Sequence, residues 1–172
     1  GGQLVPPHDK AVIEEVRQVA AEAVLFDADP GRIHELGTEV EEAYLEELKS
    51  VSLGNNGKKD LKIVFTSIHG TAITLMPQAL EALGFENVQS VQQQAVPDGS
   101  FPTVKSPNPE EAEALDMAVQ QAEKTGADLV IGCDPDADRV GIAVRDHSGD
   151  LTLLNGNQTA AVLIYYLLES WQ

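Results

Sequence analysis

Three aspartates stand at alternate positions of one short stretch, and an arginine directly follows the last of them: Asp134, Asp136, Asp138 and Arg139. Apolar residues precede this stretch over 129–133 and follow it over 140–144, which predicts a strand, an acidic loop and a second strand. Carboxylates this close together repel one another, and the repulsion is costly unless a positive charge offsets it. A hard divalent cation is the partner that such oxygen ligands favour.

Three interpretations of the acidic loop compete. An EF-hand calcium loop starts with the same alternation, but it needs glycine at its sixth position and glutamate at its twelfth. Arg139 and Arg145 occupy those positions here, so the EF-hand pattern fails twice. A solvated acidic turn is the simplest alternative, although a loop between two apolar strands is not a typical free surface. A magnesium site explains both the residue types and their position, because alternate carboxylates can share one cation with water or a phosphoryl oxygen.

Arg139 has two interpretations as well. Its guanidinium offers a planar fork of donors that suits a phosphate group held beside a cation. It could equally serve as a surface counter-ion for the aspartates. The residues alone leave both roles open.

The charge of the chain restricts its partners. Its 172 residues include 11 Lys and Arg against 28 Asp and Glu, a formal net charge of −17. Such a charge repels polyanions, so we expect neither nucleic acid nor an anionic membrane as a general partner. No apolar run reaches the roughly 18 to 20 residues of a membrane span, and no secretory signal is evident, so we expect a soluble, cytoplasmic protein. We expect the single cysteine, Cys133, to be structural, because a buried strand and neighbouring acids raise the pKa of a thiol.

The hydrophobic pattern predicts alternating helices and strands. The expected helices cover residues 9–24, 38–51, 73–83, 109–124 and 159–168, and the expected strands cover 61–67, 87–91, 129–133, 140–144 and 151–154. Residues suited to begin helices are Asp9, Asn108 with Glu111, and Thr38 with Glu41. Residues 53–59 are expected to break the pattern between the second helix and the first strand.

This order of elements predicts an α/β fold: a three-layer sandwich around a mixed, mostly parallel sheet. Ligands of such sheets gather at the carboxyl ends of the strands. We therefore expect His69 and Gly70, which follow the first strand, to lie at the same edge as the acidic loop.

Four segments resemble the α-D-phosphohexomutases, the phosphoglucomutase and phosphomannomutase superfamily. The most specific is the loop itself, residues 132–140 with the sequence GCDPDADRV. Three further segments match in the expected order: residues 65–71 (FTSIHGT), 101–111 (FPTVKSPNPEE) and 154–159 (LNGNQT). The first ten residues resemble the end of the family's first domain, so the resemblance covers nearly the whole chain.

The resemblance implies an activity and a set of roles. Members of the family surround one cleft with four domains, and a phosphorylated serine on the first domain exchanges its phosphoryl group with a phosphosugar through a bisphosphorylated intermediate. Carried over, Asp134, Asp136 and Asp138 would bind Mg²⁺ and Arg139 would contact the transferring phosphate. The implied partners are a phosphosugar substrate and the neighbouring domains with the phosphoserine, the sugar loop and the phosphate loop.

The resemblance also implies domain boundaries. Residues 1–37 would be a tail and helix that follow the first domain, residues 38–154 the metal-binding second domain, and residues 155–172 the start of the third. The nucleophile, sugar-recognition and phosphate-binding segments of the family are absent from this sequence, so we expect the chain alone to be inactive.

Some points stay open at this stage. Ala72 departs from the glycine common in related sequences, and alanine would cost about 1 kcal/mol if that position needs a positive φ. His69 is either a site residue or a strand-end histidine bonded to nearby backbone. A non-catalytic module with an acidic partner surface remains an alternative, as does, more weakly, a haloacid-dehalogenase-type phosphatase, whose distant lysine and second acidic motif are not evident.

Overall fold

A computed structural model describes residues 3–27, 29–53 and 60–171. The chain divides into two compact units, Gly1–Gly37 and Thr38–Gln172, and each is described by itself. The break predicted over residues 53–59 lies outside the described residues except for Leu53.

The described residues of the first unit form one α-helix, α1 (His8–Gln18), and two short 3₁₀ helices, η1 (Ala21–Ala23) and η2 (Pro30–Arg32). Asp9 was predicted to cap the first helix, and this is wrong: Pro7 occupies the N-cap and Asp9 lies in the first turn. The helix also ends six residues before the predicted end at residue 24, because the backbone of Val19 is extended. Its apolar side chains Val12, Ile13 and Val16 are about half exposed or more.

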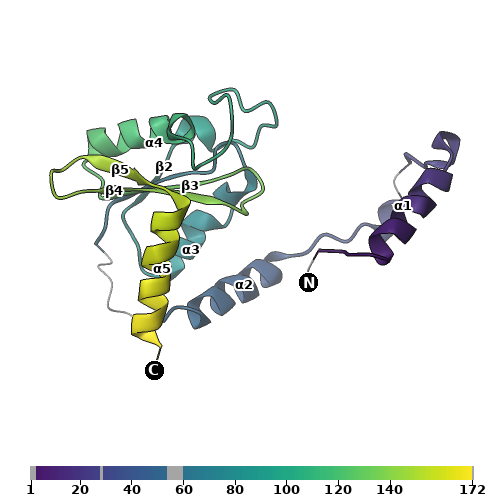
Figure 1. Ribbon diagram of the computed structural model, residues 1–172, viewed down its shortest axis with the longest axis horizontal. Helices are drawn as coiled ribbons and strands as arrows, with labels where there is room; N and C mark the ends of the chain where they lie inside the picture. The colour runs from purple at the N-terminus through teal and green to yellow at the C-terminus, as the bar shows by residue number, and fades with distance from the viewer. Residues whose placement is uncertain (1–2, 28, 54–59, 172) are drawn as a thin grey trace. The chain divides into compact units, whose positions relative to one another are not determined.

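In the second unit, the residues that the structure describes form a sheet and four α-helices (Figure 1). The strands are β1 (Ile63–Thr66), β2 (Val88–Ser90), β3 (Leu129–Cys133), β4 (Val140–Arg145) and β5 (Leu151–Leu154). The helices are α2 (Thr38–Ser50), α3 (Met76–Ala82), α4 (Ala112–Thr125) and α5 (Gly156–Ser170).

The sheet is mixed, with the strand order β2-β1-β3-β4-β5. Strand β1 pairs in parallel with β2 and β3, while β4 pairs antiparallel with β3 and β5. Only β4 therefore runs against the other four strands of the described sheet. The predicted α/β class and mostly parallel strand direction are confirmed.

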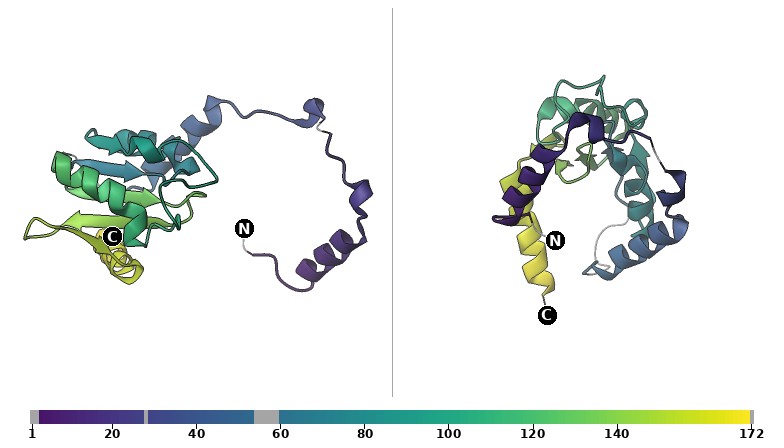
Figure 2. Two further views of the ribbon diagram at one scale, coloured as in Figure 1. Left: turned by 90° about the horizontal axis from the view of Figure 1, so that it is seen from above. Right: turned by 90° about the vertical axis from the view of Figure 1, so that its right-hand side faces the viewer.

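Helices cover both faces of the sheet, which makes the predicted three layers (Figures 1 and 2). On the face toward α4, the strand residues Val64, Val130 and Ala143 pack with Ala118 and Ala122 of the helix, and all five are fully buried. The opposite face, toward α3, carries Phe65, Ile131 and Cys133 with Met76 packed against them. The neighbouring β1 residues Val64 and Phe65 thus pack into opposite layers, because successive side chains of a strand point to opposite faces of the sheet.

Helix α4 begins at Ala112, three residues after the predicted first helical residue, and its N-cap is Glu111 rather than Asn108. Pro109 is buried against β4, where a side chain on Gly141 would come within 2.0 Å of the Pro109 carbonyl oxygen. The Asn108 amide instead donates to the Glu111 carboxylate at 3.1 Å, and Asn108 Oδ1 accepts from the Glu110 amide at 3.2 Å. Packing on the sheet keeps this segment out of the helix.

Helix α3 begins at Met76, and the short 3₁₀ helix η3 (Thr71–Ile73) replaces the predicted first turn. Ala72 lies within η3 and is absent from the described residues that have a positive φ. Alanine therefore carries no backbone penalty at this position.

Helix α5 begins one residue after its N-cap, Asn155, whose side chain accepts from the Gln158 amide at 2.9 Å in a complete capping box. None of its described residues is buried. Its large apolar side chains are 43–70% exposed: Val162, Leu163, Ile164, Tyr165, Tyr166, Leu167 and Leu168. Within the described ranges, the chain has no helix with the length and apolar character that crossing a membrane requires.

Candidate metal centre

The acidic loop leaves the sheet at the carboxyl end of β3. Thr66, the last residue of β1, pairs with Gly132 near the end of β3, so the loops that follow these two parallel strands share one edge. The prediction that the segment after the first strand lies at the same edge as the acidic loop is confirmed by a hydrogen bond from the Thr71 amide to the Pro135 carbonyl oxygen, at 2.9 Å.

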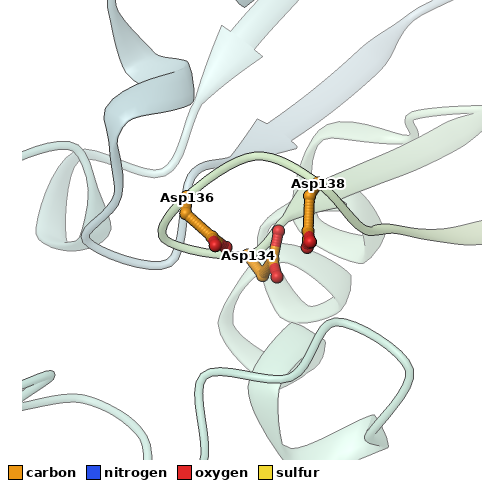
Figure 3. A group of neighbouring side chains, drawn as sticks. All are labelled: Asp134, Asp136 and Asp138. Carbon is orange, nitrogen blue, oxygen red and sulfur yellow. The ribbon is translucent and has the colours of Figure 1, made fainter. Parts of the chain in front are cut away.

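The three aspartates turn toward one another (Figure 3). One oxygen from each of Asp134, Asp136 and Asp138 can be chosen so that all three lie within 4.8 Å of one another. Asp134 is fully buried, whereas Asp136 and Asp138 are exposed. The cluster therefore has one carboxylate fixed in the protein and two at the solvent boundary.

The backbone of the loop reverses tightly. The Ala137 amide donates to the Asp134 carbonyl oxygen at 3.1 Å, and Ala137 has a left-handed φ of 61°. A left-handed residue that is not glycine costs roughly 1–2 kcal/mol. This reversal brings Asp136 and Asp138 back beside Asp134.

Arg139 closes the loop by bonding to both oxygens of Asp134. Its amide donates to Oδ1 at 2.9 Å and its Nε donates to Oδ2 at 2.8 Å. Asp138 lies farther from the guanidinium, at 3.8 Å. Among the described residues, the hydrogen bonds of this guanidinium run through Nε. Its terminal amino groups thus remain available to an acceptor outside the described chain.

The charges of the loop shift its pKa values in opposite directions. Burial raises the pKa of Asp134, but the hydrogen bonds from the Arg139 amide and guanidinium and from Asp138 outweigh it, so the pKa lies below its ordinary value. A hydrogen bond with Asp134 and the negative charges of Asp136 and Asp134 raise the pKa of Asp138. The hydrogen bond to Asp134 raises the pKa of Arg139. One arginine therefore does not offset the full repulsion among these carboxylates.

The donor set fits a hard divalent cation. Three carboxylates and no sulfur or imidazole ligand favour magnesium, calcium or manganese over zinc or copper. One oxygen from each carboxylate lies within 4.8 Å of the others, which is close enough for the three to share one ion. The two exposed carboxylates leave the outer side of such an ion open to water or to an oxygen from another molecule.

His69 takes part in a buried network rather than in the carboxylate cluster. Its Nδ1 lies 3.1 Å from the Val96 carbonyl oxygen, which can only accept, so Nδ1 carries the proton. Its Nε2 lies 2.9 Å from the Thr103 hydroxyl oxygen. Gln94 donates to the same hydroxyl oxygen at 3.0 Å and accepts from Thr66 at 2.6 Å. The geometry favours the structural interpretation of His69.

Cys133 is 4% exposed at the end of β3. Burial, together with the negative charge of Asp134, raises the pKa of its thiol to about 11. The prediction of a structural, weakly nucleophilic cysteine agrees with this environment.

An apolar groove of about 490 Å³ adjoins the loop, between α2 and α3. Tyr44 and Leu48 of α2 line one side, and Leu75, Ala79 and Leu83 lie on the side of α3. Cys133 at the end of β3 and Ala137 of the acidic loop also line the groove. None of the described residues that line it is a lysine or an arginine. This groove therefore lacks the cationic donors that a phosphate needs.

Gly70 was expected at the edge of the acidic loop, but its close approach to Pro135 was not predicted, and neither was the bond from Thr71 to the Pro135 carbonyl oxygen. Gly70 and Thr71 lie 64 to 65 positions from Pro135, and no local pattern indicates which residue a strand-end glycine will face. The only sequence signal was their position after the first strand.

Comparisons with known proteins agree on one group. The family model for "Phosphoglucomutase/phosphomannomutase, alpha/beta/alpha domain II" matches residues 42–149. A phosphoglucomutase of Staphylococcus aureus (strain USA300) is 44% identical over 130 residues, which are 76% of this chain and 23% of that protein. The crystal structure of a phosphoglucomutase/phosphomannomutase family protein from Burkholderia thailandensis superposes with a TM-score of 0.62 at 24% identity, over 76% of this chain and 26% of that one. The chain thus spans about a quarter of the length of these relatives.

Proposed function

The chain belongs to the phosphoglucomutase/phosphomannomutase family, and on that premise we propose that it is the metal-binding second domain of a mutase that interconverts hexose 1-phosphate and hexose 6-phosphate. The parent enzyme would use a phosphoserine and a bisphosphorylated sugar intermediate. The observation that carries the proposal is the convergence of one oxygen from each of Asp134, Asp136 and Asp138 within 4.8 Å.

In this function the three aspartates hold Mg²⁺, which when bound offsets the negative charge of the transferring phosphoryl group. Asp134 is the fixed ligand, because the Arg139 amide and guanidinium hold both its oxygens in place. Each of these oxygens retains a further lone pair for a cation. Asp136 and Asp138 complete the set from the exposed side of the loop.

Arg139 would orient the phosphate. Its Nε is bonded to Asp134, which fixes the plane of the guanidinium beside the carboxylates. The terminal amino groups can then donate to phosphoryl oxygens that also approach the cation. Phosphoryl transfer depends chiefly on positioning and charge stabilisation, and this pair of residues contributes to both.

The remaining parts of the active site would come from the rest of the parent protein. The groove beside the loop is apolar and lacks cationic side chains, so it does not suit a phosphosugar. We therefore propose that sugar recognition, the phosphoserine and the second phosphate site lie on other domains, and that the 172-residue chain alone has no mutase activity. The exposed apolar face of α5 fits a segment that starts the next domain, with residues 38–154 as the metal-binding domain.

Titration of the 172-residue chain with Mg²⁺ tests the metal site. We expect saturable shifts of the amide NMR signals of residues 134–139, with weak affinity because the phosphoserine oxygen is missing from the coordination sphere. The Asp134, Asp136, Asp138→Asn triple variant should lose these shifts, whereas Asp116→Asn and Asp128→Asn, outside the loop, should keep them. Shifts that persist in the triple variant would overturn the proposed metal site.

A second measurement tests the proposed reaction. Full-length parent protein that carries the triple variant should lose most of its conversion of hexose 1-phosphate, while its thermal unfolding stays cooperative. Full activity in that variant would refute the role of the three aspartates. Mutase activity of the isolated chain would refute the proposed division of the active site.

A further inference from the structure

The loop after β1 touches the acidic loop at Pro135. The Thr71 amide donates to the Pro135 carbonyl oxygen at 2.9 Å, and the Thr71 hydroxyl donates to the same oxygen at 3.2 Å. Pro135 has no amide hydrogen, so this carbonyl is its only backbone hydrogen-bonding group. Both hydrogen bonds from Thr71 therefore hold in place the residue that lies between Asp134 and Asp136.

Gly70 makes the contact sterically feasible. A Cβ atom at this position would lie 2.3 Å from Pro135 Cα and 2.6 Å from its carbonyl oxygen. The φ of Gly70 is −105°, which any residue can adopt. Glycine is therefore required here for space rather than for backbone freedom, and any side chain would push Pro135 away.

The β1 loop is itself held rigidly from its other side. Ile68 and His69 have left-handed φ values of 45° and 61°, a conformation that costs free energy and persists only where the surroundings enforce it. The His69 amide donates to the Gln94 carbonyl oxygen at 3.0 Å, and the His69 carbonyl oxygen accepts from the Asp98 amide at 3.0 Å. With the two ring bonds already described, His69 is bonded at four points.

We propose that Gly70 and Thr71 are positioning residues for the metal centre: they set where Pro135 lies, and through it the separation of the Asp134 and Asp136 carboxylates. His69 acts as the anchor that keeps these two residues in place. The inference rests on the proposed metal site for its functional meaning, but the placement of the loop can be measured with no metal present.

Two matched pairs of variants of the 172-residue chain test the proposal. Gly70→Ala introduces the clash, and Gly99→Ala is its control, because a Cβ at Gly99 meets nothing within 4 Å. Thr71→Val removes the hydroxyl bond, and Thr71→Ser retains it. Two quantities are measured: amide hydrogen exchange of Ala137 and Arg139 without metal, and the Mg²⁺ dissociation constant.

The amides of Ala137 and Arg139 both bond to Asp134. We expect their hydrogen exchange to be faster in the Gly70→Ala variant than in the Gly99→Ala variant. Loss of such supporting contacts typically weakens metal binding about 10- to 100-fold, and we expect that loss relative to Gly99→Ala. Thr71→Val should show the same changes in smaller degree, and Thr71→Ser should match the wild type. If the Gly70→Ala variant does not fold, the comparison of Thr71→Val with Thr71→Ser tests the proposal by the same two measurements.

Equal exchange within each matched pair would overturn the inference, even if Mg²⁺ binds. A wild-type chain that binds no Mg²⁺ would count against the proposed function, while the exchange comparison would still decide whether Gly70 and Thr71 fix the loop. The two failures are therefore distinguishable.

Discussion

Arg139 donates a hydrogen bond to each of the two carboxylate oxygens of Asp134. The Arg139 amide lies 2.9 Å from Asp134 Oδ1, and the Arg139 Nε lies 2.8 Å from Oδ2. The Asp134 side chain is 1% exposed and that of Arg139 is 50% exposed. Arg139 thus supplies the countercharge for a buried carboxylate and still reaches the solvent.

This pair predicts different effects for two aspartates of the cluster. Asp134→Asn should destabilise the metal-free chain by about 1.5–3 kcal/mol, since it removes hydrogen bonds to a buried charged group. Asp136→Asn should leave stability nearly unchanged or raise it slightly, because Asp136 is exposed and its charge repels its neighbours. Urea unfolding without divalent ions measures both. Equal losses of stability would contradict the pairing.

Phe65 should be a main source of stability on the α3 face of the sheet. It is fully buried between β1 and α3, and truncation of a buried phenylalanine to alanine typically costs about 3–5 kcal/mol. Phe26→Ala is the control, since Phe26 is 90% exposed and should change stability by less than about 0.5 kcal/mol. Thermal unfolding separates the two. A Phe65→Ala chain as stable as Phe26→Ala would refute the described core.

Cys133 should resist alkylation in the folded chain. Its thiol has a pKa raised to about 11, so roughly one thiol in a thousand is ionised at pH 8, and the thiolate is the reactive form. Iodoacetamide labelling followed by mass spectrometry should be slow at pH 8 and should accelerate in denaturant. Rapid labelling of the native chain would contradict this environment.

Asp146 should make the β4–β5 hairpin sensitive to acid. Hydrogen bonds from the Ser148 hydroxyl at 2.6 Å and the Asp150 amide at 3.1 Å favour its ionised form, which lowers its pKa below the ordinary value of 3.8. Because the folded-state pKa is the lower one, the carboxylate contributes stability above pH 3.8, and this stability is lost as pH falls through the folded-state pKa.

Comparison of wild type with Asp146→Asn between pH 6 and pH 2 measures that contribution. The difference in unfolding midpoint should be largest near pH 6 and should vanish at the acid end. Ser148→Ala, which removes the strongest of the hydrogen bonds, should reduce the pH dependence without abolishing it. A difference that does not change with pH would show that Asp146 acts through packing alone.

The exposed apolar face of α5 should make the chain self-associate and bind hydrophobic molecules. Contiguous apolar surface of this kind typically marks an interaction site or a cause of aggregation. The double variant Leu163→Glu, Leu167→Glu should reduce binding of a hydrophobic dye and self-association in light scattering, with the sheet intact by circular dichroism. Gln89→Glu with Gln93→Glu, two exposed positions elsewhere, adds the same charge and should have no such effect.

Local patterns in the sequence predicted most of the elements, because each depends on residues close together in the chain. The buried strand that holds Val64 and Phe65 and the helix that holds Leu115 and Ala118 both fall in this class. The errors lie where distant packing overrides a local signal. Pro109 looked like a first helical residue, but burial against Gly141 delays the helix to Ala112.

The amino-acid sequence by itself determined that three carboxylates and an arginine follow a buried strand, since spacing and strand chemistry are local properties. Only the tertiary structure decided which carboxylate is buried, that Arg139 pairs with Asp134, and that Gly70 and Thr71 meet Pro135. These relationships depend on β1 and β3 lying side by side in parallel. Contact across 64 positions depends on how the whole sheet packs, and no short stretch of sequence specifies it.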